Sequence, residues 1–241
     1  GSPAEAAGLL PGATVLAIDG EDMNGVLPEV ARLKVLGPAG TTVILTIRRE
    51  GVEQPFDVEI RRAHIIIPTV ESEMLDGQIA YVSLATFSDS SAADLQIAIE
   101  QLMTQNPKGL ILDLRNNTGG YLTSAIDIIS FFLPDGVAAY EEYGNGTRVP
   151  QEVTGDIISS EIPMVVLVNE WSASSSEIVA GALQDRGRAQ IVGVTTFGKG
   201  TVQSWISLSN DQGSVKITSA RWLTPNGNSV DGIGVTPDYE V

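Results

Sequence analysis

Two segments of the sequence place a hydroxyl group and an amine in settings that favour nucleophilic chemistry. The segment VVLVNEWSASSSEIVAGALQD, residues 165–185, is an apolar run, then a turn with four serines, then a helical pattern. A serine in such a turn exposes its hydroxyl, and the helix N-terminus favours developing negative charge. The segment GVTTFGKGTVQ, residues 193–203, places Lys199 between two glycines. A desolvated lysine can be neutral near neutral pH and can act as the base that activates a serine.

Both segments also have simpler interpretations. Ser174-x-x-Glu177 is a capping box, in which the serine only begins a helix, and most lysines in loops are solvated. The run from Gly193 to Lys199 fits G-x-x-x-x-G-K, the start of a phosphate-binding loop. That loop continues with a Ser or Thr that holds magnesium and then with a helix, whereas here Gly200 and an alternating, strand-like run follow. The sequence therefore argues against nucleotide binding.

A third segment, LILDLRNNTGGYLTSAI, covers residues 110–126. Its apolar strand pattern ends at two asparagines and the pair Gly119-Gly120, and a helical pattern follows. Adjacent glycines let the main chain approach a ligand closely and direct N–H groups at it. The same glycines could form only a tight turn between a strand and a helix, so the sequence leaves both interpretations open.

The composition excludes several classes of site. Thirty acidic and 14 basic residues give a net charge of −16, which opposes binding to the phosphate backbone of nucleic acids. The absence of cysteine excludes disulfides, thiolate metal sites and a cysteine nucleophile. The single histidine, His64, lies far from the serine turn, and we interpret it as a surface or hinge residue. We expect no metal site and no cofactor.

Neither a membrane span nor an export signal is evident in the sequence. No apolar run approaches the roughly 18 residues that a spanning helix requires, so membrane association is not indicated. The first residues, GSPAEAAGLLPG, lack the basic start and the apolar stretch of a signal peptide.

The periodicity of apolar residues predicts two domains. Residues 1–62 show strand patterns and one helical pattern, which predict a small, mainly β domain, and residues 63–78 predict a linker or hinge. From residue 79 to 241, strand patterns alternate with amphipathic helical patterns, as is typical of an α/β layer with largely parallel strands. Ligands of such sheets gather at the carboxyl ends of the strands. The three segments described above all follow strands, so we expect them to meet at that edge.

Taken together, these segments resemble the carboxyl-terminal processing proteases, also called tail-specific proteases. ILDLRNNTGG, VNEWSASSSEIVAGALQD and TFGKGTVQ resemble three blocks of that family in the same order, and TSARWLTPNGNSVDGIGVTPDYEV resembles its closing segment. GSPAEAAGLLPGATVLAIDGEDM resembles the middle of the PDZ domain that these enzymes carry. The resemblance implies an α/β core with ββα, crotonase-like layering in residues 79–241. It also implies a PDZ domain in residues 1–62 that is incomplete at its amino end.

The resemblance also implies roles for individual side chains. Ser174 matches the nucleophile of a Ser-Lys dyad, Lys199 matches its general base, and Gln203 matches the glutamine that orients the lysine amine. Asp185 matches an acidic residue that supports the dyad, although its place on a helical pattern equally fits an exposed charge.

An oxyanion hole is implied by the same resemblance. It would consist of the main-chain N–H of Ser175 and that of either Gly119 or Gly120, and the sequence does not distinguish the two glycines. Two residues depart from the family pattern, because Trp171 and Ser175 stand where glycine and alanine are usual. Ser175 therefore places a second hydroxyl beside the expected nucleophile.

The resemblance thus implies a serine endopeptidase that cleaves extended or unfolded polypeptides with free carboxyl-terminal tails, outside the cytoplasm. The PDZ domain would recognise tails or gate access to the site, and the assembly state, a homo-oligomer included, stays open. Two alternatives remain: a catalytically inactive, peptide-binding adaptor, and an acyl-transfer enzyme on a related core, which would need no nucleophilic serine.

Overall fold

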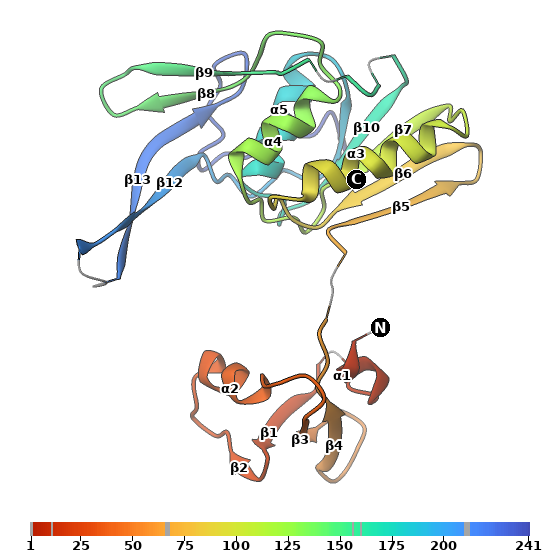
Figure 1. Cartoon of the computed structure of the whole chain (residues 1–241), viewed down its shortest axis with the longest axis vertical. Coiled ribbons are helices and arrows are strands. Elements are labelled where there is room, and N and C mark those ends of the chain that lie inside the picture. Colours follow the sequence, from red (N-terminus) through yellow and green to blue (C-terminus); the bar gives the residue numbers. More distant parts are fainter. Residues whose placement is uncertain (1, 11, 66–67, 156, 160, 210–212) are drawn as a thin grey trace. The chain divides into compact units, whose positions relative to one another are not determined.

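The computed structural model describes residues 2–10, 12–65, 68–155, 157–159, 161–209 and 213–241. The chain forms two compact units, Gly1–Ile67 and Pro68–Val241. Figure 1 shows the elements of each unit.

The amino-terminal unit is a small antiparallel sheet with two short helices. Its strand order is β2-β1-β3-β4. The elements are α1 (Pro3–Ala6), β1 (Thr14–Ile18), β2 (Glu21–Asp22), α2 (Pro28–Val35), β3 (Thr42–Arg48) and β4 (Phe56–Arg61). Alternate residues of β3, namely Val43, Leu45 and Ile47, are buried. Because side chains alternate between the faces of a strand, this pattern gives the unit one apolar face, which packs with Val58 and Ile60 of β4.

The larger unit contains a six-stranded, mostly parallel sheet in the order β14-β11-β10-β7-β6-β5. Its strands are β5 (Val70–Leu75), β6 (Ile79–Leu84), β7 (Gly109–Asp113), β10 (Met164–Val168), β11 (Gln190–Gly193) and β14 (Tyr239–Glu240). Adjacent pairs from β14 to β6 run parallel, and only β5 runs antiparallel to its neighbour β6. The α/β fold class predicted from the alternation of patterns is confirmed.

One face of this sheet is closed by helices α3 (Ser91–Met103), α4 (Leu122–Ser130) and α5 (Ser175–Asp185). The row Val82, Leu112, Val166 and Ile191 runs across four strands in register, and all four side chains are fully buried. Each helix is a crossover between parallel strands, so the segments that leave β7 and β10 enter α4 and α5 at one edge of the sheet.

A second, antiparallel sheet has the order β12-β13-β8-β9. Its strands are β8 (Val137–Tyr143), β9 (Arg148–Glu152), β12 (Thr201–Ser207) and β13 (Ser214–Leu223). In Figure 1 the β12–β13 ribbon extends away from the six-stranded sheet. The alternating run after Gly200 predicted β12, whereas no element was predicted from the sequence for residues 137–152. The edge strand β12 begins two residues after Lys199.

One expectation differs from the structure. The predicted linker, residues 63–78, contains β5, which pairs over six residues with β6. Edge strands commonly carry outward charges that oppose aggregation, and Glu71 and Glu73 of β5 are exposed. These charges weaken the apolar alternation by which a strand is recognised, so the segment resembles a linker in sequence. Among the described residues, no helix is long and apolar enough to cross a membrane.

Candidate active site

The serine turn between β10 and α5 holds its main chain in an unusual conformation. Ser174, the residue before α5, has φ 56° and ψ −114°. A positive φ at a residue with a Cβ costs about 1–3 kcal/mol and persists only where the surrounding structure enforces it. Such strain often accompanies a functional side chain, and Ser174 lies at the position where the sequence predicts a nucleophile.

The other three serines of this turn have structural roles. Ser172, Ser175 and Ser176 are buried, and their hydroxyls donate to main-chain carbonyl oxygens of the segment that follows β7. The acceptors are Leu114, Gly120 and Asn117, at 2.8, 3.0 and 2.8 Å respectively. Ser174 is only half-buried, and the proton of its hydroxyl has no acceptor within the described part of the chain. The second hydroxyl at Ser175 is therefore committed to holding two loops together.

The predicted capping box is present. The Ser174 N–H donates to the Glu177 carboxylate at 2.7 Å, as a capping box requires. The Ser174 hydroxyl faces the Glu177 N–H, which also donates to the Ser174 carbonyl oxygen at 2.9 Å. A capping oxygen only accepts, so the cap does not use the proton of the Ser174 hydroxyl.

The two positions beside Lys199 require glycine, because another loop packs directly against their main chain. A Cβ on Gly198, which has φ 87°, would lie 3.0 Å from the nitrogen of Ile233. A Cβ on Gly200 would lie 2.6 Å from the main chain of Asp231. Only a residue without a side chain allows this approach. The flanking glycines are thus explained by packing, and not by phosphate binding.

The main chain of Lys199 is fixed at both ends while its amine is free. Its N–H donates to the Glu177 carboxylate at 2.9 Å, and its carbonyl oxygen accepts from the indole of Trp222 at 2.9 Å. The residue is half-buried, and its amine makes no ion pair or hydrogen bond with a residue that the structure describes. The amine is therefore not held by another charge or acceptor of the described residues.

Glu177 connects the serine turn to the lysine loop. Its side chain is fully buried and accepts four hydrogen bonds. One oxygen, Oε2, accepts from the N–H groups of Ser174 and Lys199 at 2.7 and 2.9 Å. The other, Oε1, accepts from the Gly198 N–H and the Thr196 hydroxyl, both at 2.6 Å. From the sequence this residue was expected only to cap a helix, and the pattern Ser174-x-x-Glu177 was its one signal.

Ser174, Lys199 and Gln203 line one cavity of about 380 Å³. Its apolar wall consists of Leu122, Ile178, Val202 and Trp222. Gln203 lies on β12 with an exposed side chain, and no hydrogen bond joins its amide to the amine of Lys199 in the described structure. The three residues predicted to act together therefore share one cavity, and the orienting contact of Gln203 stays a prediction.

The two candidate glycines of the oxyanion hole differ in the availability of their N–H groups. Gly119 is buried and donates its N–H to the Asn117 side chain at 2.9 Å. The N–H of Gly120 has no acceptor among the described residues, and Gly120 lines the cavity together with Ser174 and Ser175. The N–H of Ser175, the first residue of α5, has no partner within its helix. The geometry thus favours Gly120 and Ser175 as the two donors.

Two other residues singled out in the sequence lie outside this cavity. Asp185 is the last residue of α5, roughly 15 Å along the helix from its start at about 1.5 Å per residue. Its carboxylate accepts the Asn226 N–H at 2.8 Å, so its observed contact stabilises a turn. His64 is exposed. No group of three or more potential metal-ligating side chains occurs among the residues that the structure describes.

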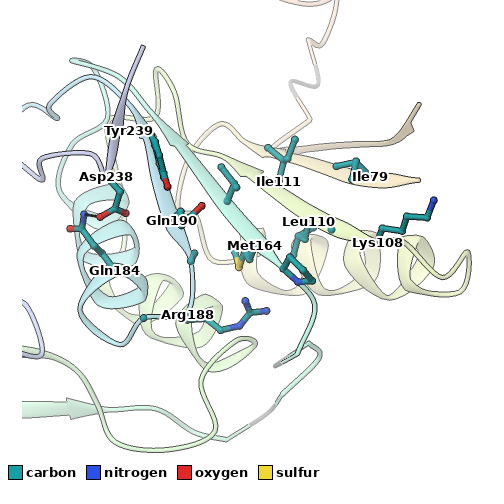
Figure 2. A pocket seen from close by; sticks show the side chains of 15 residues that line it. Ile79, Lys108, Leu110, Ile111, Met164, Gln184, Arg188, Gln190, Asp238 and Tyr239 are labelled. Atoms are coloured by element: carbon teal, nitrogen blue, oxygen red, sulfur yellow. Dashed lines mark hydrogen bonds between the residues drawn. The ribbon is translucent and has the colours of Figure 1, made fainter. Parts of the chain in front are cut away.

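A larger cavity, of about 1010 Å³, lies at the opposite edge of the sheet (Figure 2). It is lined by the first residues of β6, β7, β10 and β11, namely Ile79, Gly109, Met164 and Gln190. None of the predicted site residues lines it. Because chemistry in parallel sheets is placed at the carboxyl ends of strands, we assign the active site to the smaller cavity in spite of its size.

The strand end that precedes the two glycines is held by a buried carboxylate. Asp113 accepts the main-chain N–H and the guanidinium of Arg115, each at 2.9 Å, and the Tyr81 hydroxyl at 2.8 Å. Burial raises the pKa of Asp113, but the hydrogen bonds from Arg115 and Tyr81 outweigh burial and hold the pKa below its usual value. This carboxylate therefore stabilises the fold only while it is ionised.

Comparison with known proteins gives consistent results for both units. Residues 78–241 match the model of peptidase family S41, and residues 1–49 match that of the PDZ domain. The whole chain aligns with the carboxy-terminal-processing protease of Bartonella bacilliformis at 42% identity, over 56% of that protein. It aligns with the carboxyl-terminal-processing protease of Synechocystis at 39% identity, over 57% of that protein. The chain therefore spans little more than half the length of these curated relatives.

A solved structure with the same fold is the photosystem II D1 C-terminal processing protease. It covers this whole chain with a TM-score of 0.71 and 32% identity, and the match includes 66% of that protein.

The strained conformation of Ser174 leads to a test on stability. Glycine adopts a positive φ without strain, so Ser174→Gly should be more stable than Ser174→Ala by about 1 kcal/mol. Ser176 inside α5 is the control, because there the alanine variant should be the more stable by about 1 kcal/mol. Urea unfolding of the four variants measures both differences, and the same order at both positions would contradict the assigned strain.

The buried Asp113 leads to a test on pH dependence. Its pKa is lower in the folded than in the unfolded chain, so its stabilisation is complete above the unfolded-state pKa and disappears as pH falls through the folded-state pKa. Asp113→Asn should therefore lower the free energy of unfolding by about 1–3 kcal/mol at pH 7, and by progressively less below about pH 4. Urea unfolding at several pH values measures this loss, and an equal loss at every pH would contradict the assignment.

Proposed function

The chain belongs to peptidase family S41, and from this premise we propose that it is a serine endopeptidase acting through Ser174 and Lys199. Its substrates would be extended or unfolded polypeptides, cleaved near their carboxyl terminus. One observation carries this proposal: the hydroxyl of Ser174, whose proton has no acceptor among the described residues, and the unpaired amine of Lys199 line the same cavity. The neighbouring serines are all buried and committed to other contacts.

The proposed reaction begins with proton transfer from Ser174 to the neutral amine of Lys199. The Ser174 oxygen attacks the carbonyl carbon of the substrate, and the N–H groups of Gly120 and Ser175 stabilise the resulting oxyanion. Such a donor typically contributes about 10²–10³ in rate. The ammonium of Lys199 then protonates the leaving amine as the C–N bond breaks. Lys199 next removes a proton from water, which hydrolyses the acyl-enzyme and restores the Ser174 hydroxyl.

The position of β12 suggests how an extended substrate would bind. β12 is an edge strand that begins beside Lys199 and carries Gln203. An added peptide strand could pair with its free main-chain groups, which would place a carbonyl group over the cavity. Recognition of tails or gating by the PDZ domain, and a location outside the cytoplasm, remain parts of this proposal.

The central test is digestion of a disordered reporter protein, followed by mass spectrometry. Ser174→Ala and Lys199→Ala should each lower cleavage by at least about 10³-fold, because nucleophile and base act as a unit, and both variants should remain folded. Lys108→Ala, at an exposed lysine of the opposite edge, should cleave like the wild type. If Lys199→Ala retained most of the activity, the assignment of Lys199 as the base of the dyad would be wrong. Peptide binding without cleavage by the wild type would favour the adaptor alternative.

A negative charge placed in the cavity should change how the cleavage rate depends on pH. Only the neutral amine can accept the serine proton, so the rate should rise with pH. Gln203→Glu adds a negative charge that favours the ammonium form, and the rise should therefore move to higher pH. Ser204→Glu is the matched control, because adjacent side chains of a strand point to opposite faces. Values of kcat/KM on a peptide across pH measure the shift, and equal profiles for both variants would contradict the role of Gln203.

A further inference from the structure

We infer that Glu177 is a positioning residue whose carboxylate fixes the separation between the nucleophile and its base. This inference rests on the function proposed above. The main-chain nitrogens of Ser174 and Lys199 both donate to the same oxygen, Oε2, at 2.7 and 2.9 Å. They can therefore lie no farther apart than these two hydrogen bonds placed end to end. A main-chain hydrogen bond from the Phe197 N–H to the Ser172 carbonyl oxygen, at 3.0 Å, joins the same two loops, and Glu177 is the contact that reaches the two reacting residues themselves.

The burial of Glu177 argues for a role beyond the initiation of a helix. The side chain has no exposed surface and no ion-pair partner among the described residues. Burying an unpaired carboxylate is costly unless hydrogen bonds replace its hydration. Three main-chain N–H groups and the Thr196 hydroxyl fill this role, and the N-terminus of α5 favours the negative charge. A cap that only begins a helix requires neither the burial nor the two donors from residues 198 and 199.

Thr196 extends the same connection to the carboxyl-terminal segment. Its hydroxyl donates to Glu177 at 2.6 Å and accepts the Val235 N–H at 2.7 Å. The lysine loop is thus held on one side by Glu177 and on the other by Val235. Both anchors lie in the buried core of the larger unit, so they fix the loop against rigid elements.

Loss of this carboxylate should affect catalysis more than it affects the fold. Ser174 is held at a positive φ that it would leave if its N–H lost its acceptor. A displacement of about 1 Å between reacting groups can lower a rate by about 10²-fold. The consequence should appear in kcat, because the contacts that bind the substrate lie along β12 and in the cavity wall.

Glu177→Gln is the primary variant, because it keeps the volume of the side chain and replaces one oxygen by an NH₂ group. In either orientation the NH₂ faces at least one main-chain N–H, so two donors oppose each other. We expect kcat on an internally quenched peptide to fall by about 10²-fold with KM changed less than threefold. Thermal unfolding establishes the temperature range in which the variant is fully folded, and rates are compared within it.

The control for a purely structural effect is Ser130→Ala. Ser130 of α4 is also fully buried, donates to the Ile126 carbonyl at 2.8 Å and accepts the Thr154 N–H at 2.9 Å. It does not line the catalytic cavity. This variant should lower the melting temperature while leaving kcat unchanged in the folded range. If Glu177→Gln kept the wild-type kcat while folded, the inference would be overturned.

A second pair of variants keeps the test decisive if Glu177→Gln does not fold. Thr196→Ser retains the hydroxyl that reaches Glu177, and Thr196→Val removes it at nearly constant volume. We expect Thr196→Ser to keep at least half of the wild-type kcat and Thr196→Val to lose about tenfold. Equal kcat values for the two variants would overturn the inference. Failure of the wild type itself to cleave would instead contradict the proposed function.

Discussion

A single buried carboxylate is the constraint on which the candidate site depends. Glu177 gathers donors from the serine turn and from the lysine loop, segments that are more than 20 residues apart in the sequence, on its two oxygens. Burying a charge is favourable only when its hydrogen-bonding capacity is satisfied. Glu177 therefore holds the main-chain nitrogens of Ser174 and Lys199 close together, and the hydrogen bond from the Phe197 N–H to the Ser172 carbonyl oxygen joins the same two loops. Their side chains then meet in one cavity.

The parallel sheet makes this arrangement attainable. β7, β10 and β11 are adjacent and parallel, so the segments that follow them emerge at the same edge. The three committed serines then connect the turn after β10 to the turn after β7 through main-chain carbonyl oxygens. The hydrogen bonds from Ser172 and Ser176 are buried and that from Ser175 is partly buried, and together they rigidify the turn that carries the strained Ser174. The four serines of this turn thus have two roles. Three of them attach the turn to the segment after β7, and the fourth, Ser174, presents its hydroxyl to the cavity.

The contrast between the two cavities shows why chemistry must be argued from side chains and not from volume. The larger cavity lies at the amino-terminal edge of the sheet and contains none of the serine turn, the lysine loop or the paired glycines. The smaller one joins all three. The two adjacent glycines also differ by their contacts and not by their chemistry, because the N–H of Gly119 is occupied by Asn117 while that of Gly120 has no acceptor among the described residues.

The sequence by itself determined the α/β class, the mostly parallel sheet and the segments that carry Ser174, Lys199 and Gln203, because apolar periodicity and turn residues are local properties. It missed β5 and the β8–β9 pair, whose strands carry charged residues and pair at or near sheet edges. Only the tertiary structure decided which serine is free, which glycine N–H is available, and that Asp185 lies at the far end of α5. These features, and the four hydrogen bonds of Glu177, depend on partners that are distant in the sequence. Only folding brings such partners within hydrogen-bonding distance, so the sequence pattern does not reveal them.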